Sequence, residues 1–183
     1  MSEHSGWEGI LQPGETVLWQ GRPSGRVSFR HASPRRMVAG GFMTAFAVFW
    51  TISAAGAAGG ATDLIGRIFP LFGLIFVFLG LREAGGWEVW RAFVRRHSWY
   101  SLTSRRAFIA TEIFGRRALR SWPIDRETVL DFEEGPPDTI WFADRPGRRG
   151  RPRTRTTERV GFELIDDGRE VLRLMRNIQR GAA

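Results

Sequence analysis

The sequence predicts an α+β membrane protein: a two-helix transmembrane hairpin followed by an antiparallel split β-barrel that a C-terminal helix caps. Three observations lead to this prediction. Residues 38–61 contain no charged side chain, and a second apolar run over 68–81 follows after six residues. From residue 98 onward, hydrophobic and polar residues alternate with the period of two that is typical of β-strands. A single amphipathic stripe with helical spacing then ends the chain.

The composition fits one small domain with a membrane anchor. The chain has 183 residues, of which 43% are hydrophobic, and the longest apolar runs fall between residues 38 and 81. Its net charge is +8, and all 27 basic residues are arginines, which is typical of a GC-rich genome. Guanidinium groups bind phosphate in a bidentate manner, so this charge suits anionic lipid headgroups or nucleic acid, and a membrane anchor favours lipid. The absence of cysteine excludes disulfides, thiolate metal sites and cysteine nucleophiles.

The two apolar runs differ in how completely they match a transmembrane helix. About 20 apolar residues in a helix cross the ~30 Å hydrocarbon layer, so the first run predicts a span over about 37–58. A cleaved signal peptide has a shorter apolar core and a shorter leader than the 36 residues found here, so a retained span is favoured. The second run has only 14 uncharged residues and becomes a span over 64–81 if Arg67 reaches the headgroups. Its alternatives are a buried core helix or a re-entrant segment.

The arginines on the flanks predict the orientation of this hairpin, 37–83. Cytoplasmic flanks carry an excess of basic residues, whereas the loop between the spans offers only Asp63 and Arg67. We therefore expect both termini on the cytoplasmic side, with 1–36 as a cytoplasmic N-terminal segment and 84–183 as a cytoplasmic domain. The flanking basic residues are Arg22, Arg26, Arg30, Arg35 and Arg36 before the first span, and Arg82, Arg91, Arg95 and Arg96 after the second.

A short interfacial helix is predicted over 87–96. Tryptophan rings favour the headgroup layer, and arginines set among them favour phosphate. The alternative is a plain continuation of the second span that packs on the downstream domain. The residues expected at the membrane interface are Arg35, Arg36, Trp87, Trp90, Arg91, Arg95 and Arg96.

The remaining chain predicts six short strands and one helix. The strands are expected over 99–103, 107–111, 119–124, 129–133, 139–142 and 160–165, separated by glycine- and proline-containing turns. The helix is expected over about 168–179, with Asp167 and Glu170 forming a capping box. Six strands without intervening helices indicate an antiparallel sheet, curled or closed, whose open end the helix covers. That arrangement is of the pleckstrin-homology type.

Several short stretches also resemble a known family. They are residues 11–15 (LQPGE), 19–23 (WQGRP), 72–73 (FG), 80–81 (GL), 100–103 (YSLT) with Arg105 and Arg106, and 161–165 (GFELI). In these the chain resembles bacterial membrane-anchored proteins with a pleckstrin-homology-like domain, which are built as two spans followed by that domain. The resemblance implies a split barrel with a C-terminal helix, a place in the bacterial inner membrane and no catalytic activity. It supplies no binding residues.

No group of residues in the sequence predicts catalysis. His4, His31 and His97 are isolated, and the pair Asp166 and Asp167 fits a helix cap better than a general acid–base pair. No phosphate-binding loop, zinc-ligand spacing or nucleophile elbow is present. We therefore expect no enzyme activity, no cofactor and no metal. A membrane enzyme acting on lipids would need a carboxylate or histidine pair, for which the sequence offers no candidate.

The strongest local charge lies over residues 144–159, which hold seven arginines and two acids. We expect a long hairpin loop there that binds anionic lipid headgroups or an acidic protein partner, with a plain solvated loop as the alternative. Residues 149–153 (RGRPR) also resemble an AT-hook, an arm that lies in the minor groove of A·T-rich DNA. The predicted function is thus a non-enzymatic membrane-anchored interaction or scaffold module, and the alternative is a membrane-tethered DNA-binding protein, with nucleic acid the less favoured partner. The candidate binding residues are Arg145, Arg148, Arg149, Arg151, Arg153 and Arg155.

Overall fold

The computed structural model describes residues 7–30, 32–57, 64–146 and 157–181 as a mixed α+β chain with antiparallel sheets. The chain divides into two compact units. We call Arg26–Phe93 the helical unit, and the described residues up to Gly25 and from Val94 onward the sheet unit. Each unit is described below by itself.

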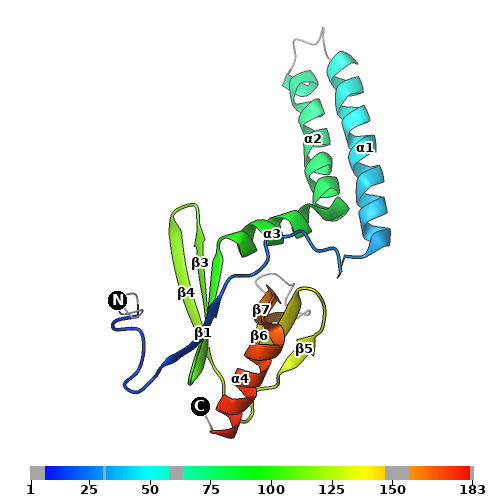
Figure 1. Cartoon of the computed structure of the whole chain (residues 1–183). Coiled ribbons are helices and arrows are strands. Elements are labelled where there is room, and N and C mark those ends of the chain that lie inside the picture. Colours follow the sequence, from blue (N-terminus) through cyan, green and yellow to red (C-terminus); the bar gives the residue numbers. More distant parts are fainter. Residues whose placement is uncertain (1–6, 31, 58–63, 147–156, 182–183) are drawn as a thin grey trace. The chain divides into compact units, whose positions relative to one another are not determined.

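The helical unit contains two long helices that lie side by side (Figure 1). Helix α1 spans Pro34–Ala57 and α2 spans Leu64–Leu81. A proline at the first helical position is favoured because its missing amide hydrogen would have no intrahelical partner, which agrees with the start of α1 at Pro34. A π-helical turn over Arg82–Gly86 then leads into α3, Trp87–Arg96. The ranges expected from the sequence were about 37–58, 64–81 and 87–96.

Small residues let the backbones of α1 and α2 approach closely. A Cβ atom at Gly80 would lie 2.8 Å from the Thr44 amide nitrogen, and one at Gly40 would lie 2.5 Å from the Ala84 amide nitrogen. The Thr44 hydroxyl donates a 2.8 Å hydrogen bond to the Gly40 carbonyl within α1. Such pairing of small residues with an internally satisfied hydroxyl suits helix packing inside a bilayer.

Large apolar side chains cover the outside of this unit. On α1, Val38 is 74% exposed and Phe42 is 76% exposed, and on α2 Phe78 is 69% exposed. Among the described helices, α1 is the one that is long and apolar enough, over Pro34–Gly56, to cross a membrane. A single candidate span, rather than two, is thus what length and composition support in the described part of the chain.

The sheet unit is built from two antiparallel sheets and a C-terminal helix. One sheet has the strand order β1-β2-β3-β4 and the other has the order β5-β6-β7, so the described strands form no closed barrel. Helix α4 packs against the second sheet (Figure 1). The elements are β1 (Val17–Gly21), β2 (Ser98–Thr103), β3 (Arg106–Ile113), β4 (Arg116–Pro123), β5 (Asp131–Glu133), β6 (Asp138–Pro146), β7 (Thr157–Ile165) and α4 (Gly168–Arg180).

One hydrophobic core joins both sheets and α4. Successive strand residues point to opposite faces, so β2 contributes alternate residues, Tyr100 and Leu102, to the core. Phe162 on β7 is fully buried at its centre, with ring centroids 4.9 Å from Tyr100 and 5.1 Å from Phe142. Helix α4 adds the buried face expected from its helical spacing, including Val171, Leu172 and Met175.

Strand β1 is the element that the sequence analysis did not predict. It pairs with β2, with Trp19 opposite Leu102, and so places part of the segment 1–36 in the same unit as the C-terminal half. Five residues carry too little alternation to identify a strand, and the pairing partner lies far along the chain. The Trp19 ring packs against the Phe162 ring at 5.5 Å, which is a contact that only the tertiary structure defines.

Several predicted boundaries and one predicted cap also differ. Strand β4 begins at Arg116 because Phe114 and Gly115 take positive φ angles of 50° and 73°, as a two-residue hairpin turn requires. Strands β6 and β7 extend to Pro146 and from Thr157, well into the predicted arginine loop. The capping box was wrong: Asp167 makes no side-chain cap hydrogen bond, because its φ and ψ of −93° and 26° lie outside the extended region that an N-cap uses.

Candidate functional site

The N-terminal segment is held on the outer face of the β1–β4 sheet by a buried ion pair. Glu15 has no exposed side-chain surface, and its carboxylate accepts a 2.6 Å hydrogen bond from Arg106 Nη2 on β3. The Thr103 hydroxyl donates a 2.6 Å hydrogen bond to the same carboxylate. The backbone amide of Gln12 donates a further hydrogen bond to the Glu15 carboxylate at 2.9 Å. The charge therefore has a counter-ion and further donors, as a buried carboxylate needs.

This network shifts the titration of Glu15. The hydrogen bond from Arg106, together with those from Gln12 and Thr103 and against the opposing effect of burial, lowers the pKa of Glu15 from 4.5 to about 2. The same contact raises the pKa of Arg106. The pair is ionised over the whole physiological range, which suits a structural clamp and is unsuited to proton transfer at neutral pH.

Beside this clamp, the same face of the sheet carries an open groove of about 390 Å³ that we call the outer-face groove. Its floor crosses three strands, with Trp99 on β2, Ala110 on β3 and Leu119 on β4 directly opposite one another in register. Trp7 from the N-terminal segment and Arg22 after β1 line it as well. These residues come from five separate parts of the sequence.

The groove combines apolar surface with one cation. The Arg22 guanidinium lies 4.9 Å from the centroid of the Trp99 ring, a cation–π arrangement that leaves the charge exposed. The Trp7 ring meets the Phe108 ring edge to face at 5.2 Å and so closes one side. Leu119, on the floor of the groove, is 45% exposed. This arrangement suits an apolar side chain adjacent to a negative charge.

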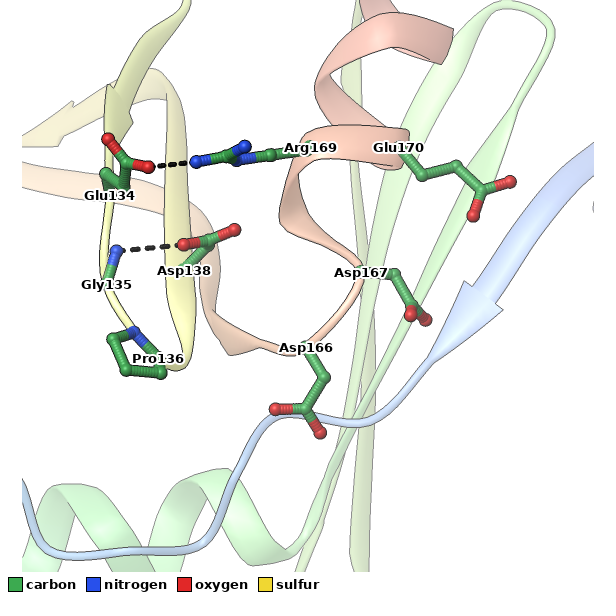
Figure 2. A pocket seen from close by; sticks show the side chains of 8 residues that line it. All are labelled: Glu134, Gly135, Pro136, Asp138, Asp166, Asp167, Arg169 and Glu170. Atoms are coloured by element: carbon green, nitrogen blue, oxygen red, sulfur yellow. Dashed lines mark hydrogen bonds and ion pairs between the residues drawn. The ribbon is translucent and has the colours of Figure 1, made fainter.

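A second, more open cavity of about 540 Å³ lies at the start of α4 and is lined mostly by acids (Figure 2). Its buried acid is Asp138, which accepts a 2.8 Å hydrogen bond from the Gly135 amide and so organises the turn before β6. Glu134 forms an ion pair with Arg169, as Figure 2 shows. Asp167 accepts a 3.4 Å hydrogen bond from the Trp19 indole.

These acids do not form a metal centre. Among the residues that the structure describes, no group of three histidine, aspartate or glutamate side chains is placed to hold an ion. The acids that line this cavity have structural roles: Asp138 organises a turn, Glu134 forms an ion pair, and Asp167 directly precedes helix α4. Of the three histidines, only His97 lies in the described residues, where its carbonyl oxygen accepts the Glu112 amide hydrogen.

Of the predicted arginine site, only Arg145 lies in the described part of the chain. Arg145 lies on β6 and pairs with Glu158 across the β6–β7 ladder. Arg159 on β7 pairs with Asp131 and Glu133 of β5 and covers the Trp141 ring of β6, which lies between those two strands. The other predicted binding residues, Arg148, Arg149, Arg151, Arg153 and Arg155, lie outside the described residues, as does the AT-hook-like stretch 149–153.

The predicted interface residues divide into two groups. Trp87 and Trp90 on α3 are 55% and 43% exposed, and Arg35 and Arg36 at the start of α1 are exposed too. Arg91 is half-buried. The last two arginines of α3 belong to the sheet unit instead. There Arg95 is buried and forms a 3.2 Å ion pair with Glu163, and the exposed Arg96 donates a hydrogen bond to the Gly25 carbonyl.

Comparisons of the chain with protein-family models, with curated proteins and with solved structures each found no match. The described residues therefore define a class by architecture alone: a mixed α+β chain in which one described helix is long and apolar enough to span a membrane, with a two-sheet unit that carries an aromatic groove. The resemblance to bacterial membrane-anchored pleckstrin-homology-like proteins stays a prediction.

Sequence reasoning did not identify the outer-face groove. Trp7, Arg22 and Trp99 are far apart in the chain, and no motif contains all three, although Arg22 falls in the stretch 19–23. The one available signal was the strand period, which places Trp99, Ala110 and Leu119 on the face opposite the core residues once the register is known. A register can be read only from the folded pairing.

Proposed function

We propose that the protein is a non-enzymatic, membrane-anchored interaction module. Its helical unit spans the bacterial inner membrane twice, and its sheet unit, a pleckstrin-homology-like split barrel, faces the cytoplasm. There it binds a protein partner or anionic lipid headgroups. The observation that carries the proposal is the dense apolar exterior of α1 and α2.

Exposing these side chains to water is unfavourable. Fully burying a large apolar side chain is favourable by about 1.5–3 kcal/mol relative to exposure, and such side chains occur along both helices. Contiguous apolar patches of this kind mark a membrane or partner surface. The exposed ones include Val38, Phe42, Phe46, Phe49, Ile52, Leu71, Phe72, Leu74, Ile75, Phe76, Phe78 and Leu81.

Two further features support the proposed membrane-anchored module. The sheet unit has four strands in one sheet, three in the other and a C-terminal helix on a shared core, which are the elements that the proposed split barrel requires. On the helical unit, Arg35 and Arg36 precede α1, and the exposed Trp87 and Trp90 follow α2. Basic residues and tryptophans at helix ends favour the headgroup layer.

Because the chain has no cysteine, its topology is testable with single introduced thiols. Glu8→Cys and Glu127→Cys place a thiol in the sheet unit, and Thr62→Cys places one between α1 and α2. In spheroplasts, a membrane-impermeant maleimide should label Thr62→Cys at once and should label the other two only after lysis. Labelling of Glu8→Cys or Glu127→Cys in intact spheroplasts would reverse the orientation. Protection of Thr62→Cys before and after lysis would contradict two spans.

The arginine segment gives a separate test of lipid binding. Arg148, Arg149, Arg151 and Arg153 changed together to glutamine should weaken binding of the detergent-solubilised protein to phosphatidylglycerol vesicles about tenfold or more, since each basic residue near an anionic surface contributes ~1 kcal/mol. Flotation against phosphatidylcholine vesicles measures the difference. Arg173→Gln with Arg176→Gln on α4 is the matched control. Unchanged flotation of the quadruple variant would remove this segment from the lipid site.

A further inference from the structure

Strand β4 lies at one end of its sheet and pairs with β3 alone (Figure 1). It is eight residues long, and seven of these are exposed, with Trp122 half-buried. A strand in this position presents a row of backbone groups that a further strand can pair with. Recognition of an extended peptide by such strand addition is a known mode of protein binding.

The hydrogen-bonding pattern identifies which β4 groups face outward. The Ile124 amide donates to the Arg105 carbonyl at 2.9 Å, so by alternation Trp122, Arg120, Ala118 and Arg116 bond to β3. An independent bond agrees: the Glu112 amide donates at 2.9 Å to the His97 carbonyl, on the side of β2. The backbone N–H and C=O groups of Arg117, Leu119 and Ser121 therefore point away from the sheet. Pro123, the next outward position, has no hydrogen to donate.

The side chains beside this edge include two exposed arginines on one face, and an exposed leucine with a third arginine on the other. Arg116 and Arg120 are exposed on the core side of β4 and make no ion pair or side-chain hydrogen bond among the described residues. Leu119 lies on the opposite face, where it lines the outer-face groove. Arg117 shares that face and pairs with Glu112 at 3.2 Å.

We infer that β4 binds an acidic, extended polypeptide segment by strand addition. The segment pairs with the backbone of Arg117, Leu119 and Ser121, sets acidic side chains against Arg116 and Arg120, and lays an apolar side chain beside Leu119. This inference rests on the proposed function and specifies the partner of that module. Positive charge on an edge otherwise blocks pairing with other copies of the same strand, whereas an acidic strand is complementary to it.

The test uses the full chain in nanodiscs of neutral lipid. A fluorescein-labelled octapeptide of alternating glutamate and valine should bind, as followed by fluorescence anisotropy. The corresponding lysine–valine peptide should not bind. A glutamate–proline peptide of equal charge should bind at least tenfold more weakly. Its prolines replace the valines that lie opposite Leu119 and its alternate neighbours, and so remove the amide hydrogens that those valines would donate to the β4 carbonyls.

Two independent variants probe the edge itself. Arg116→Glu with Arg120→Glu should weaken binding of the glutamate–valine peptide at least tenfold. Leu119→Pro should have a similar effect while keeping the near-ultraviolet circular dichroism, because the lost N–H points away from β3. Arg126→Glu, an exposed arginine outside the strand, is the charge control and should leave binding within twofold.

Absence of peptide binding, equal binding of the proline peptide, or an equal loss with Arg126→Glu would each overturn the inference. If anionic vesicles rather than the peptide respond to Arg116→Glu with Arg120→Glu, the edge serves lipid and the strand-addition proposal is also lost. The thiol-labelling pattern tests the anchor without reference to β4. A failed peptide experiment with correct labelling would therefore reject only the edge, not the membrane-anchored module.

Discussion

Replacing Phe162 by alanine should lower the free energy of unfolding of the sheet unit by about 4 kcal/mol, within the 3–5 kcal/mol typical of such truncations. The side chain is fully buried, and its ring meets three others, at 5.5 Å from Trp19, 4.9 Å from Tyr100 and 5.1 Å from Phe142. These partners lie on β1, β2 and β6, so the cavity would open where the two sheets meet. Urea unfolding of the detergent-solubilised protein, followed by tryptophan fluorescence, measures the loss.

The matched control for this variant is Phe114→Ala. Phe114 is 81% exposed in the turn between β3 and β4, so its removal should change the unfolding free energy by less than about 0.5 kcal/mol. Phe162→Leu should fall between the two because it leaves a smaller cavity. Equal effects of Phe162→Ala and Phe114→Ala would contradict the single shared core.

Replacing Glu15 by glutamine should lower the unfolding free energy by about 3 kcal/mol at pH 7. The substitution leaves the partly buried Arg106 guanidinium without its counter-ion, and breaking a buried pair from one side typically costs 3–5 kcal/mol. The same magnitude follows from the pKa of Glu15, since lowering it from 4.5 to about 2 corresponds to about 3 kcal/mol.

The sign of the pH dependence follows from the same shift. A carboxyl group whose pKa is depressed in the folded state stabilises the fold above its unfolded pKa and loses that effect as the pH falls through the folded value. The difference in unfolding free energy between wild type and Glu15→Gln should therefore be constant above pH 4.5 and should shrink between pH 4.5 and about 2. Urea titrations at several pH values measure it, with the exposed Glu127→Gln as control. A difference that is independent of pH would show that the clamp is not ionic.

The regular elements were largely predictable from local pattern. The uncharged run over 38–61 and the apolar run over 68–81 correspond to α1 and α2, and the period of two from residue 98 corresponds to strands. The helical stripe ending at Ile178 corresponds to α4. These signals depend only on the spacing of apolar side chains along a few turns or a few strand residues, so neighbouring sequence is enough to define them.

Features that depend on pairing between distant segments were not predictable. Strand β1 exists because Trp19 and its neighbours pair with β2 and pack on Phe162. Strands β6 and β7 lengthen into the arginine segment because Arg145 can pair with Glu158 across the ladder. The predicted capping box does not form because the backbone of Asp167, in the connection from β7 to α4, lies outside the extended conformation of an N-cap. Each outcome is decided by a partner remote in sequence.

The candidate site shows the same division. The excess of arginine can be seen in the sequence alone, and its local density predicts a binding segment over 144–159. Only the register showed that Trp99, Ala110 and Leu119 form the floor of one groove, and only the alternation of hydrogen bonds showed which groups of β4 face outward.

The sequence by itself determined the kind of protein, with an apolar helical part and a strand-rich part of opposite surface character, because hydrophobic spacing is a local property. The tertiary structure decided where the surface for a partner lies. It did so because a one-residue change of register would move Leu119 to the other face and turn the outward backbone groups of β4 into ladder bonds.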